Sequence, residues 1–264
     1  MPNILKMSNA GGFKTLNRYS DMLAGNTTYY PPLPSGIYAR FDASVPSSIT
    51  SSGGLVSQWN DISGNNYNAV QASSTYQPTT GSISQNGLNT ISMSAHFLLA
   101  PIAITSNAFT YFFVGSKTNA GGGANTYSRW MSLFNSAGND YDNTSSITAS
   151  YTTTTQSGYS PATYAYRNLS VIVAQAHTYG LANLSVARLN GATYTQIHNG
   201  TSATGTTSST SLNTNKMNIG SSYNVVTDSA LNGWIGEIIL YNSVLSDSDV
   251  TIVSNYLKTK WNTA

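Results

Sequence analysis

Residues 231–261 read LNGWIGEIILYNSVLSDSDVTIVSNYLKTKW, and this stretch decides the fold. Its first half, residues 234–241, is a dense apolar run rich in Ile and aromatic residues, with turn residues on both sides. Such a run is typical of a strand that is buried on both faces. We expect a central strand here, whose alternation places Gly236 and Glu237 on opposite faces.

The second half of the stretch carries the signals of a short helix. Ser246 is the expected N-cap, with Asp249 as the reciprocal acceptor three residues later. Apolar residues then recur at near-helical spacing and predict one buried stripe. We expect the helix to fold back from the strand and seal the edge of a β-structure. The stripe consists of Val250, Val253, Leu257 and Trp261.

The composition favours strands and turns over long helices. Only 8% of the residues are charged, whereas the chain holds 39 Ser, 32 Thr and 28 Asn. Short neutral polar side chains suit strands and turns. A net charge of +2 with no basic patch argues against nucleic acid as a partner. The absence of cysteine excludes disulfides and thiolate metal sites.

Targeting signals are not visible in the sequence. The longest apolar stretches have the length of strands, so we expect no membrane span. The N-terminus, MPNILKMSNAGG, lacks the apolar core of a secretory signal. The surface composition is nevertheless of an extracellular kind.

Residues 1–34 differ from the rest and are expected to form an N-terminal arm. Apolar residues recur there at helical spacing up to a stop at Gly25, and the Pro-rich segment 29–34 reads as a stiff linker. Three interpretations stay open: a helix packed on its own domain, an arm that docks onto another protein, or disorder. The candidate docking residues are Phe13, Lys14, Leu16, Arg18, Tyr19 and Met22.

Residues 35–264 read as strands and turns and predict a single two-sheet β-sandwich domain. Asn190-Gly191 between two apolar runs predicts a hairpin. Residues 202–211, rich in Ser, Thr and Gly, predict a loop. The expected strands are 37–41, 55–59, 89–93, 96–99, 109–114, 127–134, 169–175, 184–189, 192–198, 216–220 and 234–241.

The acidic residues give weak signals for catalysis or metal binding. Sugar hydrolysis usually needs two carboxyl groups, and the only glutamate, Glu237, lies inside the central strand. Distant aspartates could still join it in space. Asp61 and the segment 139–143 are possible calcium ligands, but a turn and a solvated loop are favoured because neither segment has a full ligand set.

Histidine chemistry is equally unspecific. Counting residues leaves a Ser-His-Asp triad open, but no G-x-S-x-G motif accompanies His96, His177 or His198. The three histidines lack metal-site spacing, and we expect each on a strand surface or in a satisfied hydrogen bond. The sequence therefore predicts no catalytic residue, no metal site and no cofactor. A surface of Tyr, Asn, Ser and Thr suits glycan binding or a purely structural role.

Several segments resemble the laminin-G-like, concanavalin-A-like jelly-roll domains. The resemblance covers most of residues 37–264 and implies a concanavalin-A-like jelly-roll β-sandwich with a short C-terminal helix and an N-terminal arm. Domains of this kind bind sugars, bind proteins or cap assemblies. The resemblance lies in 59–65 (WNDISGN), 186–191 (VARLNG), 217–220 (MNIG), 234–242 (WIGEIILYN), 245–246 (LS), 256–257 (YL) and 260–261 (KW).

The segments 11–19 (GGFKTLNRY) and 22–26 (MLAGN) resemble leading segments of tailed-phage virion proteins. This resemblance implies a non-enzymatic virion protein that is assembled in the host cytoplasm and displayed on the outside of the particle. It would be a head decoration protein, head fibre or tail appendage, homo-oligomeric and joined to capsid or tail proteins by its arm. The alternatives are a glycan-active enzyme and a secreted adhesin module on the same fold.

Overall fold

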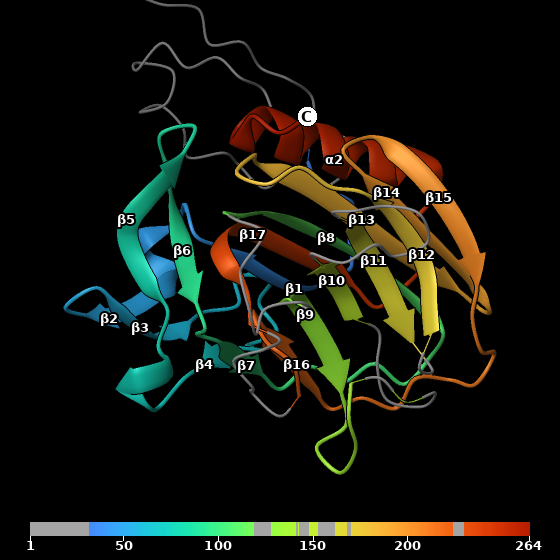
Figure 1. Cartoon of the computed structure of the whole chain (residues 1–264), viewed down its shortest axis with the longest axis horizontal. Helices are drawn as coiled ribbons and strands as arrows, with labels where there is room; N and C mark the ends of the chain where they lie inside the picture. Colours follow the sequence, from blue (N-terminus) through green and yellow to red (C-terminus); the bar gives the residue numbers. More distant parts are fainter. Residues whose placement is uncertain are drawn as a thin grey trace, which may run out of the picture. The chain divides into compact units, whose positions relative to one another are not determined.

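The computed structural model describes residues 32–118, 128–140, 142, 148–152, 162–167, 170–223 and 230–264. The chain divides into two units, Met1–Pro32 and Leu33–Ala264. In the second unit the described residues form seventeen strands and one α-helix, shown in Figure 1. The predicted all-β class with a C-terminal helix is therefore confirmed.

The strands are between two and ten residues long. Most of the expected strands are found within one or two residues of their predicted bounds; the strand expected at 96–99 is shorter, and the strand expected at 109–114 is longer. The elements are β1 (Ile37–Asp42), η1 (Pro46–Ser48), β2 (Ile49–Ser52), β3 (Leu55–Trp59), β4 (Ala69–Val70), η2 (Ser74–Tyr76), β5 (Thr79–Gln85), β6 (Leu88–Ser94), β7 (Leu98–Ala100), β8 (Ala108–Lys117), β9 (Ser128–Phe134), β10 (Thr148–Thr152), β11 (Ala162–Arg167), β12 (Ser170–Ala176), β13 (Asn183–Asn190), β14 (Thr193–His198), β15 (Thr201–Thr206), β16 (Lys216–Ile219), β17 (Asn232–Tyr241) and α2 (Asp247–Trp261).

The strands form two antiparallel layers. In the first, which we call the helix-side sheet, β15, β14, β13, β8 and β17 lie side by side. The far edge of β17 pairs with β1 and then with β6, and β5 follows β6. The opposite sheet has the order β12-β11-β10-β9-β16-β7-β4-β3-β2. A β3–β5 pairing joins the two layers.

Large aromatic side chains fill the space between the layers. Phe113 on β8 and Trp130 on β9 lie with ring centroids 3.9 Å apart, and both are buried. In β17 every residue from Gly233 to Tyr241 is buried. The prediction of a central strand that is buried on both faces is thus confirmed.

A β-bulge in β17 changes which side chains face the helix. The register with β8 shifts between Ile235 and Glu237. A Cβ atom on Gly236 would lie 2.9 Å from the ring of Trp261, and the indole of Trp261 donates a hydrogen bond to Glu237. Gly236 and Glu237 therefore both face α2, and the strict alternation expected from the sequence is wrong at this point.

The C-terminal helix begins where the sequence predicts. Ser246 is the N-cap, and its Oγ accepts a hydrogen bond from the Asp249 N–H at 3.1 Å. The carboxylate of Asp249 accepts in return from the Ser246 hydroxyl at 2.8 Å. The predicted stripe is confirmed, because all four of its residues are buried. The buried helix residues are Val250, Val253, Tyr256, Leu257 and Trp261.

The position of the helix differs from the expectation. Helix α2 packs over β8 and β13 on the face of the helix-side sheet, rather than against an edge (Figure 1). A sheet face offers apolar side chains to the buried stripe, whereas an edge offers unpaired backbone groups. The helix thus covers the second face of the central strands. Part of β13 and β14 lies beside the helix and is not covered by it.

The β13–β14 hairpin is confirmed, with a one-residue difference in its turn. Asn190 pairs with Thr193, so the turn is Gly191-Ala192, and Gly191 has a φ of +60°. The predicted loop after the hairpin is wrong for its first part, because β15 occupies Thr201–Thr206. In the described residues this strand pairs with β14. Its side chains are mostly exposed, so no apolar alternation marks it.

Candidate functional site

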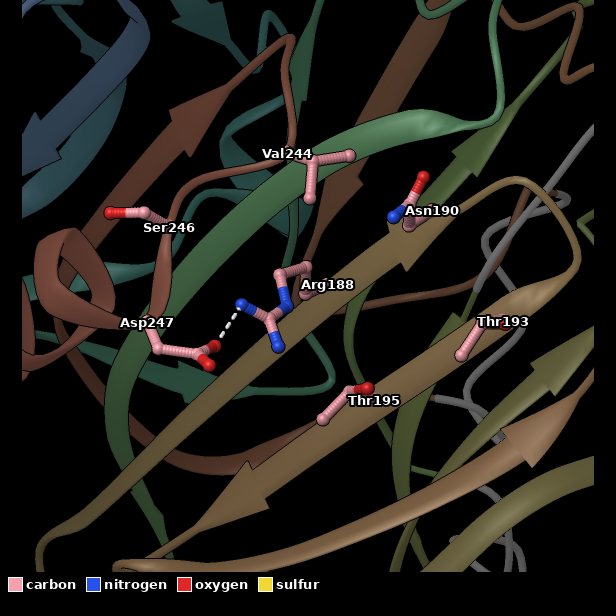
Figure 2. Close-up of a pocket in the computed structure, with 7 residues that line it drawn as sticks. All are labelled: Arg188, Asn190, Thr193, Thr195, Val244, Ser246 and Asp247. Carbon is pink, nitrogen blue, oxygen red and sulfur yellow. Dashed lines mark hydrogen bonds and ion pairs between the residues drawn. The ribbon is translucent and has the colours of Figure 1, made fainter.

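A pocket of about 280 Å³ lies between the β13–β14 hairpin and the start of α2 (Figure 2). The hairpin forms one wall with two cross-strand pairs. Arg188 faces Thr195 across the ladder, and Asn190 faces Thr193. Directly opposite residues of a strand pair lie on the same face of the sheet, so these four side chains share one surface.

The segment that enters α2 forms the other wall and is tied to the hairpin through Arg188. The Nη1 atom of Arg188 donates to the Leu245 carbonyl at 3.2 Å and forms an ion pair with Asp247. Figure 2 shows this ion pair reaching from β13 to the first residue of the helix. The Arg188 side chain is 23% exposed and that of Asp247 is 89% exposed. The two charges therefore stand at the open side of the pocket, with Val244 and Ser246 beside them.

The remaining polar groups of the pocket are neutral. Asn190 and Thr193 are exposed, and the half-buried Thr195 places its hydroxyl 3.3 Å from that of Thr204 on β15. The Ser246 hydroxyl is committed to the helix cap, and Figure 2 shows it pointing away from Arg188. Amide and hydroxyl groups beside a guanidinium offer fixed donors and acceptors to an uncharged, hydroxyl-rich ligand.

Sequence reasoning missed this site. Arg188 entered only through a fold resemblance and Asn190 only through that resemblance and the hairpin turn, and Thr193 and Thr195 belong to the commonest residue types in the chain. The sequence offered one signal. Arg188 is the single arginine of an otherwise uncharged strand, and the polar residue Thr193 of the next hairpin strand follows five residues later. The pocket also needs residues 244–247, which only the folded chain brings to the hairpin.

The predicted docking arm lies outside the described residues. This holds for all six of its candidate residues, and the docking role stays a prediction. Near the end of the proposed linker, the carbonyl of Pro34 accepts a hydrogen bond from the Tyr241 hydroxyl at 3.3 Å. The last linker residue before the sandwich is therefore tied to the central strand. The six candidate residues are Phe13, Lys14, Leu16, Arg18, Tyr19 and Met22.

Glu237 is part of a buried charge network behind α2 and does not face a groove. Its side chain has no exposed surface. It accepts hydrogen bonds from Arg40 Nε at 2.9 Å, from Lys260 Nζ at 2.7 Å and from Trp261 Nε1 at 2.9 Å. Asp42, which is 2% exposed, shares Arg40 and Lys260 with Glu237. This carboxylate pair is thus enclosed by its own counterions.

Asp61 is confirmed as a turn residue. Its Oδ1 accepts from the N–H groups of Arg40 at 2.8 Å and Ser63 at 2.9 Å. Its Oδ2 accepts from the Ser63 hydroxyl at 2.8 Å and the Tyr67 N–H at 3.1 Å. Four hydrogen bonds occupy both oxygen atoms, and the side chain closes the turn after β3.

Asp140 corrects the prediction of a solvated loop at 139–143. Its carboxylate is fully buried and pairs with Arg129 Nε at 2.6 Å. The Ser132 hydroxyl donates to the same carboxylate oxygen, Oδ2, at 2.8 Å. Asp140 therefore anchors the chain after β9 to that strand, while Tyr141 and Asn143 lie outside the described residues. The sequence signal for this contact was an arginine and a serine three positions apart on the preceding strand, Arg129 and Ser132.

Two of the three histidines lie in the interior, which corrects the expectation of a strand surface. His177 is 5% exposed and His198 is 3% exposed, with ring centroids 5.6 Å apart. His198 Nδ1 lies 2.7 Å from Ser185 Oγ, which is the satisfied hydrogen bond foreseen as the other possibility. Ser185 itself is 2% exposed, so the hydroxyl of this Ser-His pair does not face solvent. His96 is half-buried before β7.

Within the described ranges, no three His, Asp or Glu side chains gather closely enough to hold a metal ion. Over the same ranges, no helix has the length and apolar character needed to cross a membrane.

Comparison with known proteins finds similarity at the level of the fold. No protein-family model matches the chain, and no curated protein sequence matches it. Among solved structures, an arabinofuranosidase complexed with arabinofuranosyl-α-1,2-xylobiose has a TM-score of 0.57 at 12% identity. A Trypanosoma rangeli sialidase in complex with sialic acid has a TM-score of 0.59 at 11% identity.

The extent of the matches differs between these structures. This chain is covered to 86% and 90%, but it spans only 60% of the arabinofuranosidase and 37% of the sialidase. Domain 4 of AbnA, a GH43 extracellular arabinanase from Geobacillus stearothermophilus in complex with arabinotriose, is covered to 97%. That match has a TM-score of 0.54 at 11% identity and covers 82% of this chain. The sandwich therefore resembles these carbohydrate-active proteins in fold.

Proposed function

We propose that the sandwich is a glycan-binding module and that the pocket between the β13–β14 hairpin and α2 holds the sugar. The observation that carries this proposal is the lining of that pocket. It presents the Asn190 amide, two threonine hydroxyls and a guanidinium held by Asp247 at one exposed surface. These groups match the hydroxyl pattern of a sugar ring, which both donates and accepts hydrogen bonds.

The fold supports the same proposal. The chain resembles domains from proteins that act on or bind carbohydrates, and one of these is a separate domain described in complex with arabinotriose. A shared fold does not by itself carry a ligand from one protein to another. The pocket is therefore the stronger argument, and the fold makes a carbohydrate ligand the first to test.

We also propose that the module binds without cleaving its ligand. Glycoside hydrolysis usually uses two carboxyl groups on either side of the scissile bond. The only glutamate is enclosed behind α2, and Asp61 and Asp140 are both buried and hydrogen-bonded. Asp247 is the one carboxylate of the pocket and is engaged by Arg188. These positions favour binding over the alternative of a glycan-active enzyme.

A glycan array tests the binding proposal. Thr193→Trp fills the pocket from an exposed strand position and is expected to weaken every glycan signal about tenfold or more. Thr50→Trp is the matched control, because Thr50 is also an exposed strand threonine and lies on β2 of the opposite sheet. Equal binding by Thr193→Trp and the control would contradict the assigned pocket. A wild-type protein that binds no glycan would contradict the function.

The role in a tailed-phage particle rests on residues 1–34 and stays a prediction. Removal of residues 1–31 tests whether the arm joins the sandwich to capsid or tail proteins. The truncated protein should keep a folded sandwich, because the Tyr241–Pro34 hydrogen bond is retained. We expect an unchanged unfolding midpoint and loss of incorporation into particles. Normal incorporation of the truncated protein would show that the arm is not the attachment segment.

A further inference from the structure

A second pocket, of about 230 Å³, lies further along the same side of α2. The hairpin and the helix again form its two walls, but its chemistry differs from that of the first pocket. Its floor is apolar and its rim carries hydroxyl, amide and ammonium groups. The floor consists of Leu184, Val186, Ile197 and Val250. The rim includes Thr251, Ser254, Asn255 and Lys258.

The two pockets are neighbours along the hairpin. The Arg188–Thr195 pair lines the first pocket, and the next pair on the same face, Val186–Ile197, lines the second. On the helix, Asp247 lines the first pocket, and Thr251, one turn later, lines the second. The Thr251 hydroxyl donates a hydrogen bond to the Asp247 carbonyl at 2.8 Å. From residue 184 to residue 190, six steps along the strand span about 20 Å. This length exceeds a single sugar ring and suits consecutive units of a chain.

The chemistry of the second pocket matches an acetamido group. Such a group joins a methyl group, which would lie on the apolar floor, to an amide that can bond to the rim. Hydroxyls and an amide of Thr251, Ser254 and Asn255 supply those partners. A sugar that carries only hydroxyl groups would place one of them against the floor without a hydrogen-bond partner, which is unfavourable.

We propose that the groove along α2 binds an oligosaccharide with an N-acetylated unit in the second pocket and a neutral neighbouring unit in the first. This inference rests on the proposed glycan-binding function and adds the class of sugar and the order of the units. It also assigns the helix a direct part in recognition, because four of its exposed or half-buried residues form the rim.

The test uses pairs of oligosaccharides that have the same length and linkage and differ only in acetamido against hydroxyl groups. N-acetylated chito-oligosaccharides with cello-oligosaccharides, and corresponding galacto-configured pairs, are suitable probes on an array. We expect the N-acetylated member of the bound pairs to bind about tenfold more tightly, the usual discrimination for a methyl-sized group in an apolar pocket.

Two helix variants form a matched comparison. Thr251 and Thr259 are both exposed, and each hydroxyl donates to the carbonyl four residues earlier at 2.8 Å. Thr251 lines the second pocket, whereas Thr259 lines neither pocket. Thr251→Trp should abolish the preference for the N-acetylated member, and Thr259→Trp should retain it.

The outcomes separate this inference from the proposed function. Equal binding of both members of every pair, or a preference that Thr251→Trp leaves unchanged, would overturn the assignment of the second pocket while glycan binding stands. Absence of binding to every glycan would overturn both.

Discussion

Replacement of Glu237 by alanine is expected to lower the free energy of unfolding by about 3–5 kcal/mol, the usual cost of removing one member of a buried ion pair. Glu237 has no exposed surface, and the Lys260 and Arg40 side chains are only 11% and 21% exposed. Without the carboxylate, both cations keep Asp42 alone as an acidic partner. The Trp261 N–H and the Tyr256 hydroxyl also lose an acceptor.

The pKa values of the neighbours agree with this picture. Burial acts to lower the pKa of Arg40, but Glu237, Tyr256 and Asp42 together outweigh burial and raise that pKa above its ordinary value. Burial raises the pKa of the Tyr256 hydroxyl, and the nearby Glu237 carboxylate raises it further. The network is therefore fully charged at Arg40 and neutral at Tyr256 under physiological conditions.

Urea unfolding of three variants measures the effect. Asp247→Ala removes an ion pair whose carboxylate is 89% exposed, so its cost should stay below about 1 kcal/mol. Glu237→Gln keeps the shape of the side chain and removes only its charge. This variant gives a measurable free energy of unfolding if the alanine variant does not fold. A cost for Glu237→Gln no larger than that for Asp247→Ala would show that the buried network does not stabilise the sandwich.

Acid is expected to destabilise the fold from about pH 6.5 downward because of the two interior histidines. Burial lowers the pKa of His198 to about 4. Burial, assisted by the charges of His198 and Lys117, lowers the pKa of His177 to about 2. In the unfolded chain both groups titrate near pH 6.5. Between these values the unfolded chain binds more protons than the folded one, so stability falls with falling pH.

The size of the effect follows from the shift of the His198 pKa. A shift from 6.5 to about 4 corresponds to a loss on the order of 3 kcal/mol once the pH reaches about 4. Most carboxylates titrate near or below pH 4.3, so the window from pH 6.5 to 4.5 reports mainly on histidine. Unfolding midpoints across that window should fall steadily for the wild-type protein.

Histidine variants identify the source of the acid sensitivity. His198→Gln and His177→Gln should each flatten the pH profile, since glutamine does not titrate. His96→Gln is the comparison with a smaller expected effect, because burial also lowers the pKa of His96, but this side chain is only half-buried and lies outside the interior pair. A profile that is already flat for the wild-type protein, or that keeps its slope in both interior variants, would contradict neutral buried histidines.

The sequence predicts much of the framework because local signals and tertiary structure agree there. The apolar run around Ile238 gives the central strand, and the Ser246 cap and its stripe give the helix. The Asp61 turn is equally local, since all hydrogen-bond partners of the Asp61 side chain except Arg40 lie within six residues. Such features need no knowledge of distant contacts.

Other features depend on contacts that periodicity does not encode. An apolar stripe requires a partner but does not say whether that partner is a face or an edge of a sheet. The bulge at Gly236 is set by the approach of Trp261, which lies 25 positions later in the chain. β15 has the composition of a loop and is a strand only because β14 pairs with its backbone.

The candidate site belongs to this second group. Its residues are an arginine, an asparagine and threonines of ordinary kind, and each alone carries no chemical signal. They form a pocket because the β13–β14 hairpin and the entry to α2 meet, and because Arg188 joins them through Leu245 and Asp247. A composition rich in Thr and Asn hides such a site instead of marking it.

A crystal structure of the protein with an oligosaccharide selected on the array tests the central claim most directly. We predict that the sugar lies along α2, with one unit hydrogen-bonded to Asn190 or Thr193 and the next over Val186 and Ile197. A sugar bound elsewhere would contradict the claim, for example against the exposed Tyr76 beside Phe97, whose ring centroids lie 5.8 Å apart.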